Sequence, residues 1–346
     1  MVRVIHATSL ILKNMAFNFP ASFNYALACI NSIIKPSYVL NKPVSVLLEP
    51  TTKCNLKCKM CARTYWENPK IGDMVFRNFK KVIENFNFLI GSDDIQTGLC
   101  LTGLGEPFLN KDIFKMIRYA KYKKKIPYVY IISNGTVITS KVAKRIVLSG
   151  LDHLAISLDG ATKETYEKIR VGANFNLVIQ NIKKLVEIRN KVGKKPTIRL
   201  CFVLQSENAN DLNEVINLGK ILNVDMVSAT IINPHFPQKN NLAYLAQIPQ
   251  VEQAYKKARE LGINFKYTDH YLDKCLYPWV CPYITWNGFV TPCCVKPDPE
   301  EFNFGNVFED SFSSIWNSKK YKKFRESLNS KAPPQICRGC PKIPKR

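Results

Sequence analysis

The feature that most constrains the fold is a regular alternation of two patterns between about residue 44 and residue 235. Short apolar runs rich in β-branched residues alternate with longer stretches in which apolar residues recur at the helical period. Strands that alternate with helices form right-handed βαβ units, which place the strands in one parallel sheet. The expected strands are 44–48, 95–102, 127–133, 153–158, 197–204 and 226–232, and the expected helices lie near 75–89, 110–124, 139–148, 162–190 and 208–222.

Six parallel strands are too few to close an eight-stranded barrel. We therefore expect an α/β fold, a partial (β/α)6 barrel of the TIM type, whose active site lies at the carboxyl ends of the strands. From about Asp269 the alternation stops, and cysteine and proline become frequent. A hairpin is expected around Asn287-Gly288, because this dipeptide favours a tight turn. A helix is expected near 314–328.

These patterns divide the chain into four parts. An apolar, helical N-terminal extension covers residues 1–43, and the barrel covers 44–240. A linker with a helix covers 241–268, and a small cysteine-rich domain covers 269–346.

Three cysteines stand close together just after the first expected strand, as Cys54, Cys58 and Cys61. A [4Fe-4S] cluster normally takes four thiolates, and no fourth cysteine occurs before Cys100. The group of three therefore predicts a cluster with one iron left open, and an open coordination position is where chemistry takes place. Zinc sites usually pair two short C-x2-C units, so the C-x3-C-x2-C spacing favours iron and sulfide over zinc.

The composition indicates the cellular compartment and the kinds of partner to expect. The twelve cysteines among 346 residues fall into short-spaced groups, which favours metal binding in a reducing compartment over a disulfide scaffold. No convincing signal peptide begins the chain, so we expect a cytoplasmic protein. The net charge is +23, but the lysines are scattered along helices without interleaved aromatic residues, and a nucleic-acid partner is not expected. The apolar segment 9–34 is interrupted by Pro20, so no spanning helix is expected. It could form a pair of helices that lies on a membrane, as a peripheral contact, or packs across the domain.

The C-x3-C-x2-C run after the first strand resembles the signature of the radical S-adenosylmethionine (SAM) superfamily. The resemblance implies that Cys54, Cys58 and Cys61 bind three irons, while the amino and carboxylate groups of SAM bind the fourth. It also implies that an electron from the cluster breaks a C–S bond of SAM. The resulting 5′-deoxyadenosyl radical then abstracts hydrogen from a C–H bond of the substrate.

Further residues at the strand ends match positions of this superfamily. Gly103, Gly105 and Glu106 resemble the glycine-rich motif that accepts hydrogen bonds from the SAM ammonium group. The resemblance assigns Asn134, Ser157 and Asp159 to the methionine or ribose part of SAM, Arg170 to its carboxylate and Leu204 to its adenine. Each of these residue types also occurs in ordinary turns, helix caps, surface ion pairs or cores, and that alternative stays open.

The last part of the chain holds a second cysteine pattern, in which Cys275, Gly288 and Cys293 form C-x12-G-x4-C and Cys337 and Cys340 form C-x2-C. It resembles the twitch domain, a shortened SPASM domain that binds an auxiliary [4Fe-4S] cluster with four cysteines. Two alternatives stay open: Cys281 or Cys294 replaces Cys275 or Cys293 as a ligand, or the four cysteines bind zinc. The remaining cysteines, Cys29, Cys100 and Cys201, have apolar neighbours and are expected to be buried thiols.

Together the motifs predict an enzyme that cleaves SAM reductively and abstracts hydrogen from a substrate, for a two-electron oxidation or a related modification. The auxiliary cluster is expected to assist. One alternative is a peptide-modifying maturase of the same superfamily, and another is a non-catalytic zinc or iron–sulfur protein. The expected partners are a small-molecule or peptide substrate and a low-potential electron donor such as flavodoxin or ferredoxin. No side chain is assigned as the acid or base.

Overall fold

The computed structural model describes residues 19–66, 70–86, 97–193, 195–232, 248–269, 275–340 and 342–343. Within these ranges nine strands form one sheet in the order β7-β6-β5-β4-β3-β2-β1-β8-β9. All neighbouring pairs are parallel except β8 and β9, which are antiparallel. The strands are β1 Ser45–Leu48, β2 Gly98–Leu101, β3 Val129–Ser133, β4 His153–Ser157, β5 Thr197–Leu204, β6 Met226–Ile231, β7 Asn264–Thr268, β8 Tyr283–Ile284 and β9 Val290–Thr291.

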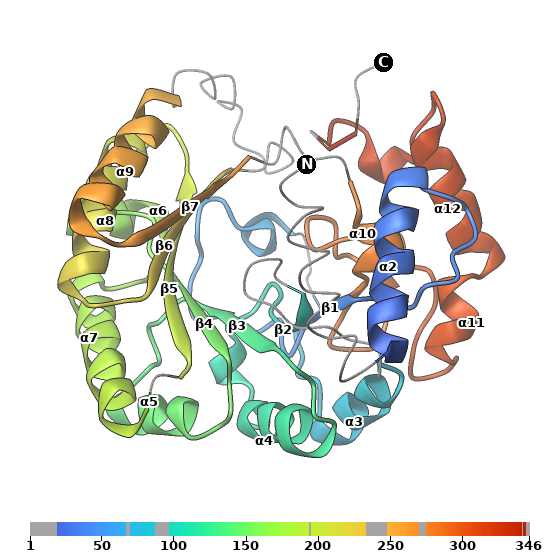
Figure 1. Ribbon diagram of the computed structural model, residues 1–346, viewed down its shortest axis with the longest axis horizontal. Helices are drawn as coiled ribbons and strands as arrows, with labels where there is room; N and C mark the ends of the chain where they lie inside the picture. The colour runs from blue at the N-terminus through green and yellow to red at the C-terminus, as the bar shows by residue number, and fades with distance from the viewer. Residues whose placement is uncertain are drawn as a thin grey trace.

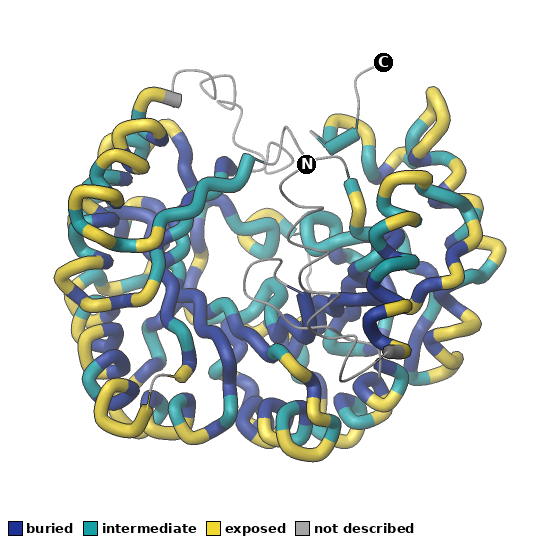
Figure 2. The backbone as a smooth tube through the Cα atoms, viewed as in Figure 1, coloured by how far each residue is buried: buried dark blue, intermediate teal, exposed yellow. Residues whose placement is uncertain are grey.

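The sheet forms the inner wall of a barrel that is open, because its end strands β7 and β9 do not pair with each other. Helices lie outside it (Figure 1), and their outward faces are exposed, whereas the central strands β1 to β4 are mostly buried (Figure 2). The open, partial barrel predicted from the sequence is therefore confirmed. The helices that connect its strands are α3 Phe76–Glu84, α4 Ile113–Arg118, α5 Ser140–Val147, α6 Lys163–Ile169, α7 Phe175–Val192, α8 Leu212–Ile221 and α9 Ile248–Leu261.

All six expected strands are present, and β7 extends the sheet by one more parallel strand. β7 lies in the segment that the sequence analysis assigned to a linker. Its sequence, Asn-Phe-Lys-Tyr-Thr, is mostly polar, and none of its residues is fully buried. An edge strand needs only one half-buried face, so it lacks the apolar run by which the central strands were recognised.

Two segments that were expected to form single helices each form two. The segment 162–190 breaks between α6 and α7, where Gly172 has a φ of 93° and the side chain of Asn174 accepts from the Leu177 N–H to begin α7. Such a backbone conformation ends a helix and favours glycine. The segment 314–328 divides into α11 Phe312–Trp316 and α12 Lys319–Asn329, where Ser318 caps α12.

The C-terminal region adds to the barrel sheet and does not form a separate layer. The expected hairpin is present as β8 and β9, with Gly288 at a φ of 90° between them. β8 also pairs in parallel with β1, which brings the cysteine-rich part of the chain beside the first barrel strand. A short helix, α10 Tyr277–Val280, precedes β8.

The N-terminal helix α2, Phe19–Ile34, lies outside the barrel in the same half of the molecule as α10 and α12 (Figure 1). Its inner side, formed by Ala21, Tyr25 and Ala28, packs with Val44 and Val280. Among the described residues, no helix has both the length and the apolar character needed to cross a bilayer.

The side chain of Asn110 connects the segment after β1 to the segment before α3. Its amide Nδ2 donates to the carbonyl oxygens of Pro50 at 2.7 Å and Met74 at 3.0 Å, and both bonds are buried. We expect Asn110→Ala to lower the free energy of unfolding by about 2–3 kcal/mol, because two buried acceptors lose their donor. Asn217→Ala, which removes an exposed bond to Glu214, should change it by less than about 0.5 kcal/mol. Urea unfolding of the cluster-free protein measures both, and equal effects would contradict the prediction.

Candidate active site

The loop that carries Cys54, Cys58 and Cys61 leaves the carboxyl end of β1 and has almost no regular structure of its own. Backbone hydrogen bonds hold it against two neighbouring segments. The N–H groups of Lys57 and Lys59 donate to the carbonyls of Val171 and Ile169, at 2.9 and 3.0 Å. The N–H of Glu106 donates to the Lys53 carbonyl at 2.8 Å. The cysteine loop is therefore fixed between the glycine-rich loop after β2 and the break between α6 and α7.

The three cysteines belong to one apolar cluster. Cys58 is buried in it, and Cys54 and Cys61 are half-buried at its border. Burial raises the pKa of the Cys58 thiol to about 11, and it also raises the pKa of Cys54. Thiolates in this setting need nearby positive charge, which metal ions supply. The remaining members of the cluster are Leu56, Met60, Ile169, Ala173, Val203 and Ile232.

The glycine-rich loop approaches the cysteine loop so closely that side chains would not fit. A Cβ on Gly105 would lie 2.3 Å from the Thr51 carbonyl oxygen, and a Cβ on Gly103 would lie 2.5 Å from Cγ of Glu49. Such separations are far below a van der Waals contact, so both positions require glycine. The backbone of this loop is thus available beside the cysteines.

Glu106 is 2% exposed and lies at the centre of a buried hydrogen-bond network. Its carboxylate accepts from the Asn134 N–H at 2.7 Å, the Ser133 hydroxyl at 2.8 Å and the Phe108 N–H at 3.2 Å. Burial nevertheless raises its pKa to about 6. A buried acid of this kind favours a cationic group nearby, such as an ammonium.

Asn134 and Ser157 occupy the ends of β3 and β4. Asn134 donates to the Asn55 side chain at 3.1 Å and points its amide at the sulfur of Cys54, 3.9 Å away. It therefore lies beside the cysteine loop. Ser157 is half-buried and pairs in the sheet with Cys201.

Asp159 and Arg170 form a buried ion pair, which the sequence analysis did not expect. Nε and Nη2 of Arg170 each lie 2.6 Å from Oδ2 of Asp159, and Oδ1 accepts from the Val203 N–H at 2.6 Å. Both Asp159 oxygens thus accept hydrogen bonds within the protein, and its predicted role toward the methionine or ribose part of SAM stays a prediction. The pair directs Nη1 of Arg170 to 3.8 Å from the sulfur of Cys58.

The position of Leu204 does not suit its predicted contact with the adenine of SAM. Its side chain is fully buried in the main core, whereas its neighbour Val203 belongs to the cluster around the cysteines. Successive residues of a strand face opposite sides, so only one of the two can face the barrel interior. Val203 is in that position.

Sequence reasoning missed Glu49, a 2% exposed carboxylate directly after β1. It accepts from the Leu104 N–H and the Tyr283 hydroxyl, both at 3.0 Å, and from the Trp286 N–H at 3.3 Å. It therefore links the glycine-rich loop to the C-terminal region, and burial raises its pKa to about 7. An acid immediately after a buried strand was the signal that could have identified it.

The four cysteines of the second predicted group line one pocket. Cys275, Cys293, Cys337 and Cys340 form its wall together with apolar residues and Lys296. The two alternative ligands lie outside it: Cys281 belongs to a different cluster of buried residues, around Cys100 and Tyr283, and Cys294 packs against that cluster. Cysteine thiolates gathered in this way are the usual ligands of iron–sulfur clusters.

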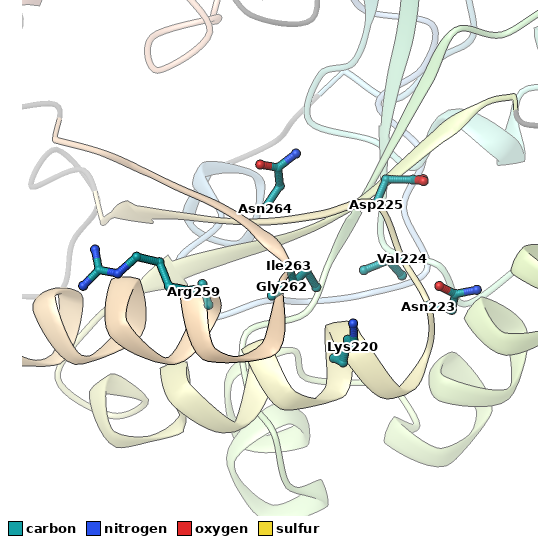
Figure 3. A pocket seen from close by; sticks show the side chains of 9 residues that line it. Lys220, Asn223, Val224, Asp225, Arg259, Gly262, Ile263 and Asn264 are labelled. Carbon is teal, nitrogen blue, oxygen red and sulfur yellow. The ribbon is translucent and has the colours of Figure 1, made fainter.

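A second pocket lies at the opposite ends of the strands and is separate from both cysteine groups. Figure 3 shows it between the C-terminal ends of α8 and α9, next to the starts of β6 and β7. Its polar lining includes Lys220, Asn223, Asp225, Arg259 and Asn264. The carboxyl ends of the strands, not this end, carry all the predicted site residues of the barrel.

The barrel is open and parallel, three cysteines follow its first strand, and four more cysteines line a pocket in the C-terminal region. This combination is typical of the iron–sulfur enzymes that use SAM. The Radical SAM superfamily profile matches residues 48–219, and that of an iron–sulfur cluster-binding domain, SPASM, matches residues 275–341. These matches lie within the predicted ranges 44–240 and 269–346, whose boundaries themselves stay predictions.

Individual relatives agree with these matches. The tungsten-containing aldehyde ferredoxin oxidoreductase cofactor-modifying protein of Pyrococcus furiosus is 30% identical over 304 residues, 80% of this chain and 82% of the relative. A PqqA peptide cyclase of Rhizobium meliloti is 24% identical over 86% of this chain and 79% of its own length. The crystal structure of Streptococcus suis SuiB bound to S-adenosylmethionine has the same fold, with a TM-score of 0.65 at 18% identity over 87% of this chain and 72% of SuiB.

The chain therefore belongs to the radical SAM superfamily and carries a SPASM-type iron–sulfur domain. It is an enzyme whose cofactors are [4Fe-4S] clusters and SAM. This assignment replaces the alternative of a non-catalytic zinc or iron–sulfur protein.

The raised pKa of Glu49 makes stability depend on pH. Its ordinary pKa is 4.5 and its pKa in the folded protein is about 7, so the folded state favours the protonated acid. The resulting stabilisation is complete below pH 4.5 and is lost as pH rises to 7. Relative to Glu49→Gln, which does not titrate, the natural protein should therefore lose about 3 kcal/mol over this interval. Melting temperatures of both proteins at pH 5 and pH 8 measure the difference, with Glu326→Gln as an exposed control; parallel pH profiles would contradict it.

Proposed function

We propose that Cys54, Cys58 and Cys61 bind three irons of a [4Fe-4S] cluster and that SAM binds the fourth. When bound and reduced, the cluster and SAM supply one-electron cleavage of a sulfonium C–S bond and hence abstraction of a hydrogen atom. The support is the apolar cluster that holds the three thiols at the carboxyl ends of the strands. Apolar surroundings exclude water, which protects reactive species from side reactions.

The residues around this loop would position SAM. Buried Glu106 and the half-buried backbone at Gly103 and Gly105 would provide acceptors for the SAM ammonium group. Arg170, held by Asp159 with one guanidinium nitrogen near Cys58, provides positive charge for the SAM carboxylate. Asn134 and Ser157 remain candidates for the polar part of SAM, and Val203 replaces Leu204 as the apolar contact.

We further propose that Cys275, Cys293, Cys337 and Cys340 bind an auxiliary [4Fe-4S] cluster, which would supply an electron acceptor beside the barrel. The support is that these four line one pocket that neither Cys281 nor Cys294 lines. Loss of a hydrogen atom, a proton and an electron from the substrate amounts to a two-electron oxidation. The pairing of β8 with β1 places the segment between Cys275 and Cys293 next to the barrel strand that leads into the cysteine loop.

A peptide substrate is the second candidate, beside a small polar or phosphorylated metabolite. It is favoured by the PqqA peptide cyclases among the relatives and by the likeness to SuiB, one structure of which contains its precursor peptide SuiA. A low-potential donor such as flavodoxin or ferredoxin would supply the electron. Mass spectrometry of extract components treated with the enzyme separates the two: a small product that has lost two hydrogens supports the metabolite, and a crosslinked peptide supports the maturase.

Single cysteine variants test the two cluster assignments. We expect about eight irons per chain after anaerobic reconstitution. Cys58→Ala should abolish formation of 5′-deoxyadenosine from SAM, because the cluster loses a ligand. Cys337→Ala should lower the iron content by about half and retain that formation while substrate conversion stops. The measurements are iron content and chromatography of the nucleoside products.

The control for these variants is Cys29→Ala on α2, which belongs to neither cysteine group and should behave like the natural protein. If a fully iron-loaded natural protein does not cleave SAM, the proposal is wrong. If Cys337→Ala keeps all its iron, the auxiliary ligand set is wrong.

A further inference from the structure

Helix α2 exposes an apolar side to solvent. Phe23 is 57% exposed, Ile30 49%, Ile33 76% and Ile34 69%. At 3.6 residues per turn, positions 23, 30, 33 and 34 fall on one face of the helix, opposite the side that packs with Val44. The sixteen residues of α2 include no charged side chain.

The exposed apolar surface continues after the helix. Tyr38 is 53% exposed and Leu40 is 73% exposed. We call these six residues, Phe23, Ile30, Ile33, Ile34, Tyr38 and Leu40, the α2 apolar face. Surface helices normally turn polar residues outward, and contiguous exposed apolar surface marks a place of interaction. The outward face of α2 therefore fits an apolar partner.

Positive charge borders this face. The sequence has no Asp or Glu before Glu49, whereas α12 begins Lys-Lys-Tyr-Lys-Lys at residues 319–323. Hydrogen bonds and a cation–π contact join α12 to the segment after α2: Asn329 donates to the Lys35 carbonyl at 2.6 Å, and Nζ of Lys322 lies 5.3 Å from the Tyr38 ring centre. Both helices lie in the same half of the molecule (Figure 1). Within the described residues, the four lysines of α12 form no ion pair with an acid.

We propose that the α2 apolar face and the lysines of α12 form a peripheral binding surface for an anionic lipid bilayer. The apolar side chains enter the boundary between headgroups and acyl chains, and the lysines contact the lipid phosphates and carboxylates. A second copy of the chain is a poorer occupant, because it would bring two such lysine groups together on molecules that each carry a net charge of +23. The proposal is independent of the proposed reaction and would bring the enzyme to a membrane surface.

Vesicle sedimentation of the full, cluster-loaded protein tests the proposal. The protein should bind vesicles of phosphatidylcholine with 30% phosphatidylserine at least tenfold more tightly than vesicles of phosphatidylcholine alone, and salt should weaken this binding. Ile30→Glu with Ile33→Glu should reduce binding at least tenfold. The matched control is Ile221→Glu on α8, where the native side chain is 77% exposed, and it should have no effect.

A second pair of variants tests the lysines of α12. Lys319→Glu with Lys323→Glu should remove most of the preference for phosphatidylserine, whereas Lys141→Glu with Lys144→Glu, the same charge change on exposed positions of α5, should not. SAM cleavage by every variant should equal that of the natural protein, which shows that folding and the active site are intact.

Three results would overturn the proposal. One is the absence of vesicle binding by the natural protein, and another is an equal effect of the α2 variants and Ile221→Glu. The third is a dimer in solution that Ile30→Glu with Ile33→Glu dissociates, since the face would then join two copies.

Discussion

The position of the cysteine loop depends on backbone hydrogen bonds to two other loops, because residues 53–61 form no strand and no regular helix. One bond joins Lys53 to Glu106, and two more join Lys57 and Lys59 to the chain that follows α6. The same bonds therefore bring the glycine-rich loop and Arg170 to the cysteines. Parallel strands make this possible, since their carboxyl ends all meet at one edge of the sheet. A change in any of these loops would move the thiols relative to their neighbours.

The barrel site contains several buried ionisable side chains. Glu106 and Glu49 are enclosed with several donors each, yet burial raises both pKa values. Asp159 binds the guanidinium group of Arg170, one nitrogen of which lies 3.8 Å from the sulfur of Cys58. Glu49 also reaches Tyr283 and Trp286, so the barrel site and the C-terminal domain share a buried carboxylate. The strand pairing of β1 with β8 and these hydrogen bonds thus connect the segments that carry the two cysteine groups.

Local patterns predicted the elements that have strong signals. The six central strands are continuous apolar runs, and the cysteine spacings are short enough to be read along the chain. β7 was missed because a half-buried edge strand can be polar. The break between α6 and α7 was missed because the helical period resumes after Gly172. The α2 segment was recognised as apolar, but its sequence did not show which side would stay exposed once the helix packed on Val44.

The alternation of strands and helices and the spacing of cysteines within each short motif follow from the sequence, because each depends on residues close together in the chain. Tertiary structure alone decided that Asp159 binds Arg170, that Val203 and not Leu204 faces the cysteines, and that Glu49 joins the two domains. It also decided which cysteines share a pocket. These outcomes depend on the register of neighbouring strands and on which side of the sheet each side chain faces. A strand that is apolar throughout has no alternating pattern from which either could be predicted.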